Sequence, residues 1–276
     1  MVTASERGFS ILELLTAMAI MLAATAGVLT LMMPSHGTLA AQSEASDMQQ
    51  RLRVGVDAVA KGVLAAATLS ASVASIRPYR VGAVRPDPPD TFRSDTISVF
   101  STPLAPGVMR SATYWQQSDT GAATFQLMFY DGSPAGADVP VVDHVVSLAF
   151  EYFGDPRPPT STAPLEESTC LFEAGDPPTP RLAVLGDGPE LIALTAAQLT
   201  DGPWCPDAAS SDRWDADLLR IRRVAATLRV EAAAASLRGP ASALFMRGGT
   251  SRGGHSWVPD IEVHFDVSPR NMNRGR

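Results

Sequence analysis

The sequence predicts an α+β protein in which one long N-terminal helix precedes a series of β-strands. Two patterns carry this prediction. An apolar run over residues 9–33 leads into an amphipathic helical stripe, and in several later segments apolar and polar residues alternate. Helices and strands that are segregated along the chain are typical of the α+β class. The 276 residues leave enough chain beyond the helix for one domain with its own core.

The apolar run is long enough to cross a membrane. Between Phe9 and Met33 the only ionisable side chain is that of Glu13. A helix of this length spans roughly 37 Å, and the hydrocarbon core of a bilayer is about 30 Å thick. A charged side chain costs about 2.5–3.5 kcal/mol at the centre of a membrane helix, and such residues usually have a functional partner. The run therefore predicts a membrane-spanning helix with one functional charge near its start.

Residues 34–75 are expected to form the amphipathic second half of this helix. Residues 34–37, with a proline first and a glycine last, are predicted to interrupt the helix, which resumes near Leu39. Apolar residues then recur at spacings of three and four, at Met48, Leu52, Val56, Val59 and Val63. The helix is expected to run to about Ala74, before Arg77 and Pro78 end it.

Alternation at a period of two predicts the strands of the domain over residues 76–276. These strands are Thr96–Ser101, Thr124–Tyr130, residues 141–153 and Ile261–Val267. In the last one, Ile261, Val263, Phe265 and Val267 are expected to face inward. Residues 218–232 and residues 191–199 each fit a helix or a strand. Loops are expected over residues 81–93, 154–180, 200–217 and 239–254.

The first eight residues form a short polar segment ahead of the apolar run. One interpretation is a cleaved secretory signal, with Arg7 as its basic flank and Ala24-Thr25-Ala26 as its cleavage site. Glu13 argues against this interpretation, because a carboxylate inside the short apolar region of such a signal weakens insertion. A plain membrane anchor explains the length of the run but leaves Glu13 unexplained.

The spacing of Gly8, Phe9 and Glu13 resembles the leader of type IV pilin-like proteins. In that pattern a short hydrophilic segment, here containing Arg7, ends in Gly8, and Glu13 is the fifth residue after the cleavage point. The resemblance implies that residues 1–8 are a prepilin leader. A prepilin peptidase would cleave between Gly8 and Phe9 and N-methylate Phe9, and residues 9–33 would serve as a transmembrane and assembly helix.

The same resemblance implies a pilin-like fold and a location. The helix would span the inner membrane once with its first half and pack its second half on an antiparallel β-sheet in the periplasm. In the filament, at its base or tip, Glu13 would be a subunit-assembly residue. It would pair with the N-terminus of a neighbouring subunit, an α-amine with an ordinary pKa of about 7.7–8.0. Such a pair fixes register as well as lowering the cost of burying either charge.

Two later segments are similar to strands of PilW-like minor pilins. One carries Val146, Leu148, Phe150 and Tyr152 on one face, and the other is the sequence RRVAATLRVEA, which favours a strand within residues 218–232. The chain is therefore interpreted as a minor pilin for the assembly, priming or tip of a type IV pilus. Its implied partners are other minor and major pilins or pseudopilins, the prepilin peptidase and an inner-membrane assembly platform.

Two alternatives stay open. A J-type pseudopilin of a type II secretion system shares the leader and the architecture. A membrane-anchored periplasmic binding protein or hydrolase would keep the bond between Gly8 and Phe9 uncut.

Cys170 and Cys205 are the only cysteines, and both follow the membrane segment. In an oxidising periplasm they would most simply form one disulfide. In the chain-entropy model this disulfide would stabilise the fold by roughly 3–4 kcal/mol.

No enzyme activity, cofactor or metal is expected from the remaining motifs. Gly249-Thr250-Ser251-Arg252-Gly253 matches the G-x-S-x-G pattern of serine hydrolases, but it lacks the flanking strand and helix that the nucleophile elbow needs. The aspartates of residues 200–217 do not have the spacing of an EF-hand, so a solvated loop is favoured over a calcium site. Basic residues do not cluster with aromatic ones, so the sequence offers no support for nucleic-acid binding.

Overall fold

The computed structural model describes residues 9–66, 74–82, 85–101, 110–119, 124–156, 172–173, 176–177, 179–180, 190–206, 210, 212–252 and 256–269. Within them the chain forms one long helix and a set of antiparallel β-sheets, as the α+β prediction requires.

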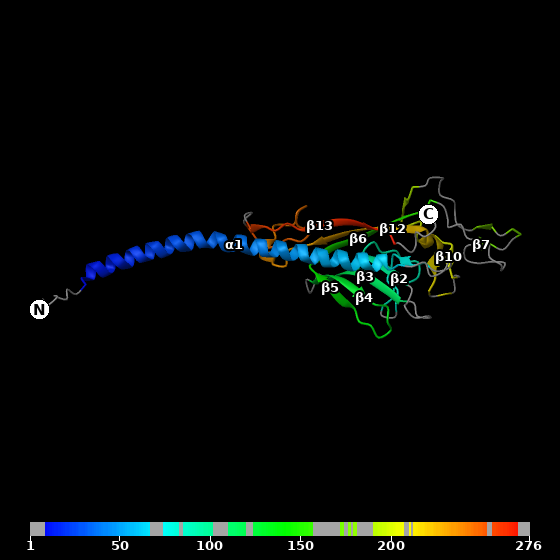
Figure 1. Ribbon diagram of the computed structural model, residues 1–276, viewed down its shortest axis with the longest axis horizontal. Coiled ribbons are helices and arrows are strands. Elements are labelled where there is room, and N and C mark those ends of the chain that lie inside the picture. Colours follow the sequence, from blue (N-terminus) through cyan, green and yellow to red (C-terminus); the bar gives the residue numbers. More distant parts are fainter. Residues whose placement is uncertain are drawn as a thin grey trace.

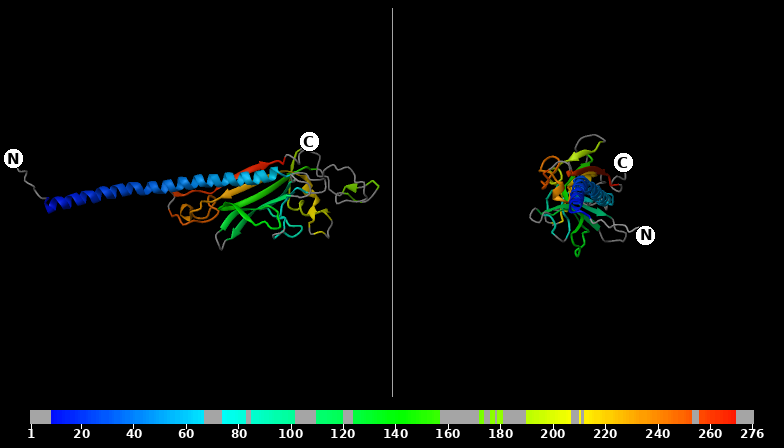
Figure 2. Two further views of the ribbon diagram at one scale, coloured as in Figure 1. Left: turned by 60° about the horizontal axis from the view of Figure 1, so that its bottom comes forward. Right: turned by 90° about the vertical axis from the view of Figure 1, so that its left-hand side faces the viewer.

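The helix, α1, is a single element of 54 residues, Ile11–Leu64. Its N-terminal part projects away from the rest of the molecule, and its C-terminal part lies along the β-sheets (Figures 1 and 2). One side of this second half is buried: Met48, Val59 and Val63 are all at most 1% exposed. The predicted apolar stripe is therefore the face that packs on the sheets.

Two details of the predicted helix are wrong. The backbone stays helical through residues 34–37, although a proline inside a helix removes one hydrogen bond and crowds the carbonyl four residues earlier. The helix also ends at Leu64, earlier than the expected end near Ala74. Ala65 N donates to the carbonyls of Lys61 and Gly62, and Ala66 is fully buried, so the helix ends where the chain turns into the core.

The first sheet has five antiparallel strands in the order β1-β2-β3-β4-β5. They are β1 Ile76–Arg77, β2 Thr96–Ser101, β3 Arg110–Asp119, β4 Thr124–Tyr130 and β5 Val139–Asp143. The predicted strands Thr96–Ser101 and Thr124–Tyr130 are confirmed, whereas β3 was not predicted.

The second sheet has four antiparallel strands in the order β13-β12-β6-β9. They are β13 Ile261–Val267, β12 Ile221–Val230, β6 Val145–Gly154 and β9 Ile192–Leu194. Strand β13 has the predicted alternation of half-buried apolar and exposed polar residues, and β12 confirms the strand favoured within residues 218–232. The short 3₁₀ helix η1, Ala216–Arg220, precedes β12.

The single strand predicted over residues 141–153 is wrong, because it is divided between the two sheets. His144 separates β5 from β6 and has a φ of +59°. This left-handed conformation is uncommon for residues other than glycine, although histidine adopts it more often than most. It turns the chain out of the first sheet and into the second.

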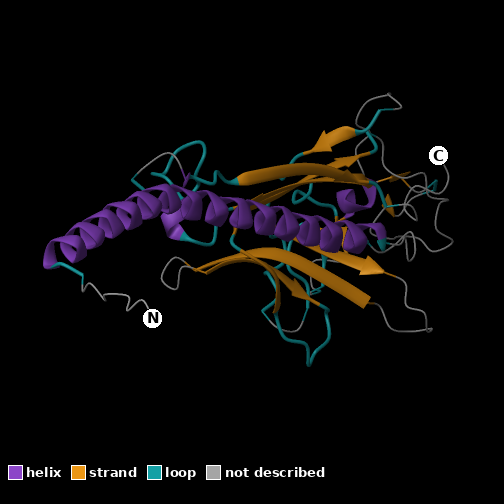
Figure 3. Ribbon diagram, turned by 60° about the vertical axis from the view of Figure 1, so that its left-hand side comes forward, coloured by secondary structure: helices purple, strands orange, loops and turns teal. Residues whose placement is uncertain are grey.

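The second half of α1 lies over the junction of the two sheets (Figure 3). Gly55 faces Leu228 of β12, Val142 of β5 and Leu127 of β4, so one turn of the helix touches both sheets. The sheets are joined beneath it by Gln116, which donates to Val145 O (3.0 Å) and accepts from Leu148 N (3.2 Å). One continuous core results.

The end of the domain farthest from the start of α1 carries two small ribbons. Strand β7 Phe172–Glu173 pairs with β8 Thr179–Pro180, and β10 Trp204–Cys205 pairs with β11 Trp214–Asp215. A second 3₁₀ helix, η2 Ala235–Leu237, follows β12 at the opposite end of the second sheet.

Candidate functional site

The N-terminus of α1 is closed by a capping box between Ser10 and Glu13. Ser10 Oγ accepts a hydrogen bond from Glu13 N (3.2 Å), and a Glu13 side-chain oxygen accepts one from Ser10 N (3.1 Å). The two side chains thus satisfy two of the backbone donors that every helix leaves unpaired at its start. The pattern Ser-x-x-Glu is a local signal for this capping box, but the prediction for Glu13 rested on its charge alone.

This arrangement gives Glu13 a structural role within its own chain. The charge nevertheless stays open to a partner, because both capping residues are exposed and Phe9 beside them is 91% exposed. A carboxylate in the first turn is also favoured by the positive end of the helix dipole. Gly8 lies outside the described residues, so the predicted cleavage point stays a prediction.

The first half of α1 is apolar on every side and is exposed along its length in the described part of the chain. All residues from Phe9 to Met32 are exposed, including Ile11 (79%) and Leu31 (80%). In the part of the chain that the structure describes, α1 is the one helix long and apolar enough to cross a membrane. An apolar surface of this size needs a nonaqueous partner.

The cysteine prediction falls partly outside the described residues. Cys205 lies in β10, is buried and is bonded in a disulfide. Cys170, its predicted partner, lies outside the described residues, so the pairing of Cys170 with Cys205 stays a prediction.

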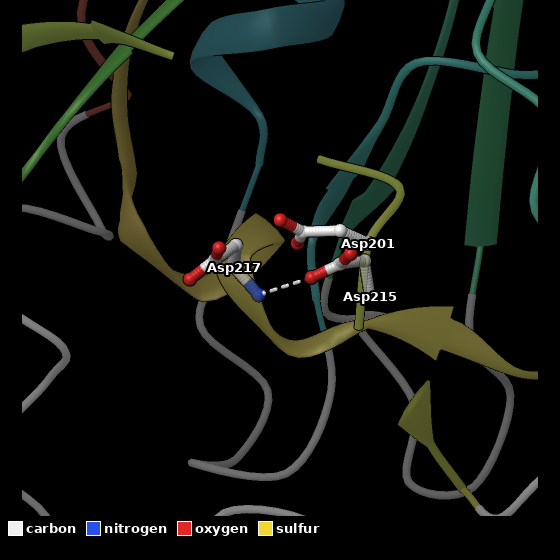
Figure 4. Close-up of side chains that lie close together, drawn as sticks. All are labelled: Asp201, Asp215 and Asp217. Carbon is white, nitrogen blue, oxygen red and sulfur yellow. Dashed lines mark hydrogen bonds between the residues drawn. The ribbon is translucent and has the colours of Figure 1, made fainter. Parts of the chain in front are cut away.

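Three aspartates come together next to the ribbon of β10 and β11 (Figure 4). Asp201, Asp215 and Asp217 each place a carboxylate oxygen within 4.8 Å of the others. Asp212 is not part of the group, and Asp207 lies outside the described residues. Oxygen ligands in such a group are the kind that Ca²⁺ prefers.

The hydrogen bonds of the group give it a structural role. Asp215 accepts from Gly202 N and from Asp217 N, both at 2.7 Å, and thereby caps η1. Asp217 pairs with the fully buried Arg220 at 3.1 Å. Burial raises the pKa of Asp215 to about 6, and burial also raises the pKa of Asp217. These bonds fix the local chain path, and the burial of Asp215 and Asp217 shows that the solvated loop predicted here is wrong for both residues.

A buried ion cluster that the sequence analysis missed lies at the other end of the domain. Glu231 is fully buried and pairs with Arg238 and Arg247, both at 2.6 Å, and lies 3.7 Å from His144 Nδ1. Burial favours a higher pKa for Glu231, but the hydrogen bond from His144 and the two arginine charges outweigh it and lower the pKa. Residues this far apart in the chain give no sequence signal for such a cluster.

The same cluster ties α1 to the second sheet. Arg51 pairs with Glu44 on the helix and donates to Glu231 O (3.1 Å), and Glu44 accepts from Ala233 N (2.8 Å). These bonds fix the helix to the segment that follows β12. They therefore position the helix on the second sheet.

The G-x-S-x-G segment does not assemble a catalytic triad among the described residues. Ser251 Oγ accepts from Trp257 Nε1 (3.0 Å), His264 Nδ1 lies 2.9 Å from Thr227 Oγ1, and Asp260 pairs with Arg229. Gly253 and His255 lie outside the described residues. The serine, the histidine and the aspartate thus each have a different partner.

Comparison with protein-family models finds no match to this chain, and comparisons with curated proteins and with solved structures find none either. The candidate site is therefore defined by its own features: the exposed, apolar first half of α1, whose first turn carries one carboxylate.

Proposed function

We propose that the chain is a minor pilin that takes part in the assembly or priming of a type IV pilus or lies at its tip. The observation that carries the proposal is the contrast along α1. Its first half offers an apolar surface with a single carboxylate at Glu13, and its second half is packed across antiparallel sheets. A subunit that must leave a membrane and enter a helical bundle needs both parts in one helix. A J-type pseudopilin of type II secretion needs the same parts and is the alternative.

In this proposal the β-rich domain lies in the periplasm and residues 9–33 cross the inner membrane. The prepilin peptidase releases residues 1–8 and exposes the α-amine of Phe9. During assembly Glu13 of one subunit pairs with the amine of another, so that two charges are neutralised inside an apolar bundle. The capping box supports this role, because it holds the Glu13 carboxylate at the very start of the helix.

Processing is the first test. Mass spectrometry of the mature N-terminal peptide, from cells that contain the assembly system, is expected to find a methylated Phe9. A mature chain that begins at Gly27 instead would indicate ordinary secretion and would exclude the proposal.

A pair of substitutions at Glu13 separates the charge from the helix cap. Glu13→Ala removes both, whereas Glu13→Gln removes the charge and keeps a side chain that serves equally in a capping box. Loss of one partner from a buried ion pair costs about 3–5 kcal/mol, so both variants are expected to remain in the membrane and to be absent from filaments. Fractionation and immunoblotting of sheared filaments would measure this.

One outcome of this experiment would contradict the proposed assembly role of Glu13. If Glu13→Gln entered filaments at the normal level while Glu13→Ala did not, Glu13 would act as a helix cap and not as an assembly charge. Cleavage of both variants at the normal rate is the control for correct membrane insertion.

A further inference from the structure

Four strands form the outer edges of the two large sheets, and three of them are short or interrupted. Strand β1 has two residues and β9 has three. Strand β5 contains Pro140, which lacks a backbone donor, and its pairing with β4 has a register shift between Leu127 and Met128. Short strands, prolines and bulges are devices by which natural proteins keep a sheet edge from pairing with another chain.

The fourth edge strand, β13, has none of these features. It is the red strand beside α1 in Figures 1 and 2. It runs for seven residues without a proline or a glycine, and it pairs with β12 in one unbroken register. In the part of the chain that the structure describes, no backbone group outside β12 bonds to this strand. Its other edge therefore offers a row of backbone donors and acceptors to a further strand.

The apolar side of β13 is incompletely covered. On β12, Leu228 and Val230 are at most 1% exposed. Their cross-strand partners on β13, Val263 and Ile261, pack against the same core but stay partly exposed, as does Phe265. A further strand beside β13 would cover the apolar area that these side chains leave open, and burial of apolar area favours such an addition.

The polar side of β13 indicates the charge of a partner strand. Its carboxylates Glu262 and Asp266 have side chains that are 55% and 49% exposed. Toward β12, Glu262 lies 4.0 Å from Arg229 and Asp266 lies 3.7 Å from Arg223, so charges of opposite sign alternate from one strand to the next. A basic residue opposite each carboxylate on the open edge would continue this alternation, and opposite charges that face one another stabilise a pair of strands.

The same carboxylates disfavour a second copy of the chain as the partner. Two copies of β13 paired antiparallel along their whole length would meet at His264, and Glu262 of each would face Asp266 of the other. A parallel pair in register would bring identical carboxylates together. Like charges directly opposite one another destabilise a pair of strands. The charge pattern therefore favours a different chain as the occupant of this edge.

We propose that β13 is a docking edge that accepts an extended, basic segment of a partner protein as an additional strand. Apolar residues on one side of the segment cover the partly exposed side chains of Ile261, Val263 and Phe265. Basic residues four positions apart on its other side face Glu262 and Asp266. Backbone hydrogen bonds supply the attachment, and the alternate side chains supply specificity. The inference goes beyond the proposed function and depends on the second sheet alone, since it needs neither a membrane nor a filament.

Binding of designed peptides to the full chain in detergent tests the proposal. In the probe peptide threonine and valine alternate, and arginine replaces two threonines that lie four positions apart. A second peptide carries glutamate at these two positions. Fluorescence anisotropy is expected to show about tenfold tighter binding of the arginine peptide, since two attractive cross-strand pairs replace two repulsive ones. Hydrogen–deuterium exchange is expected to slow in residues 261–267 when this peptide is bound.

N-methylation of the arginine peptide tests whether its backbone pairs with β13. The amides of the valines point to one edge of an extended peptide, and the amides of the other residues point to the opposite edge. Two versions are made, one methylated at the valines and one at the other residues. Only the version that keeps the amides facing β13 is expected to bind.

Charge reversal on β13 is the matched test in the protein. Glu262→Lys combined with Asp266→Lys is expected to reverse the preference, so that the glutamate peptide binds more tightly. Glu151→Lys is the control, because Glu151 is exposed and, like Asp266, pairs with Ala225 of β12, but from the other side. Glu151 would lie three strand spacings, about 14 Å, from an added strand, which exceeds the screening length of about 10 Å in 0.1 M salt. This variant is expected to keep the parental preference.

Three results would overturn the proposal. The first is equal affinity of the parent chain for the two peptides, or no binding of either at millimolar concentration. The second is undiminished binding of both methylated versions, which would show charge attraction without strand pairing. The third is slowed exchange in residues 261–267 that grows with chain concentration in the absence of peptide, which would identify a second copy of this chain as the occupant.

Discussion

The two halves of α1 are both apolar, but they differ in what their apolar side chains touch. From Phe9 to Met32 every side chain is exposed, whereas Met48, Val59 and Val63 in the second half are buried against the sheets. Apolar side chains therefore have two different roles within one continuous helix. In the second half it stabilises the fold of the chain itself, and in the first half it suits a partner outside the chain.

The halves also differ in how they hold charge. Among the described residues, Glu13 is bonded to its own helix terminus, through Ser10. In the second half, Glu44 and Arg51 bond to residues 231–233, far away in sequence. Charge in the packed half thus fixes the helix to the sheets, while charge in the exposed half is left available.

Among the substitutions that test this comparison, Val59→Asp is expected to change the free energy of unfolding most. Val59→Asp places a carboxylate at a site that is 1% exposed, and we expect the free energy of unfolding to fall by about 4 kcal/mol or more. Val54→Asp is the matched control, because the same residue five positions earlier on the same helix is 44% exposed. That variant is expected to change stability by about 0.5 kcal/mol or less.

Chemical unfolding of the full chain in detergent, followed by near-ultraviolet circular dichroism, measures both variants. Equal losses at Val54 and Val59 would mean that the second half of α1 is not packed on one side, and the comparison between the two halves would fail.

Regular patterns made part of this fold predictable. Strands β2, β4 and β13 were predicted with correct bounds, and β13 alternates cleanly. Strand β3 was missed because its buried positions include Thr113, whose hydroxyl lies 2.8 Å from that of Ser98 in the core. A polar residue that is buried because its hydroxyl bonds to one on another strand cannot be recognised from the hydrophobic periodicity of the sequence.

The candidate site shows the same limit. Phe9 and Glu13 could be singled out because their motif is local, and the capping box was equally local. The cluster around Glu231 could not be predicted, since His144, Arg238 and Arg247 meet it only after the sheets have formed. The boundary between β5 and β6 depends on the backbone conformation of His144 alone. The apolar run that was predicted as one strand therefore forms two strands.

A second prediction compares an exposed carboxylate with a buried one. Asp215 is 1% exposed, and burial raises its pKa to about 6, against about 3.9 in an unfolded chain. The folded state therefore holds this proton more tightly. The stabilisation is fully present below about pH 4 and is lost as the pH rises through about 6, with a total of about 3 kcal/mol.

Asp215→Asn removes this titration. The fall in unfolding free energy between about pH 4 and pH 6.5 is expected to be shallower in the variant than in the parent chain. The slope is the quantity to compare, because the variant also loses an acceptor for Gly202 N or Asp217 N at every pH. Asp212→Asn, at an exposed position, is expected to keep the parental slope, and a parental slope in Asp215→Asn would contradict the prediction.

The smallest expected effect comes from giving each half of the helix the same methyl group. Gly62→Ala places a Cβ only 2.5 Å from the ring of Tyr114, which is 6% exposed and packs on Phe129. Overpacking of this kind costs about 1–3 kcal/mol, and the higher helix propensity of alanine offsets up to about 1 kcal/mol. A net loss of about 1 kcal/mol is expected. Gly27→Ala meets nothing within 4 Å, so in detergent it is expected to leave the unfolding midpoint of the domain unchanged. If both substitutions raised the midpoint, helix propensity alone would govern α1, and close contact with the sheet at Gly62 would be excluded.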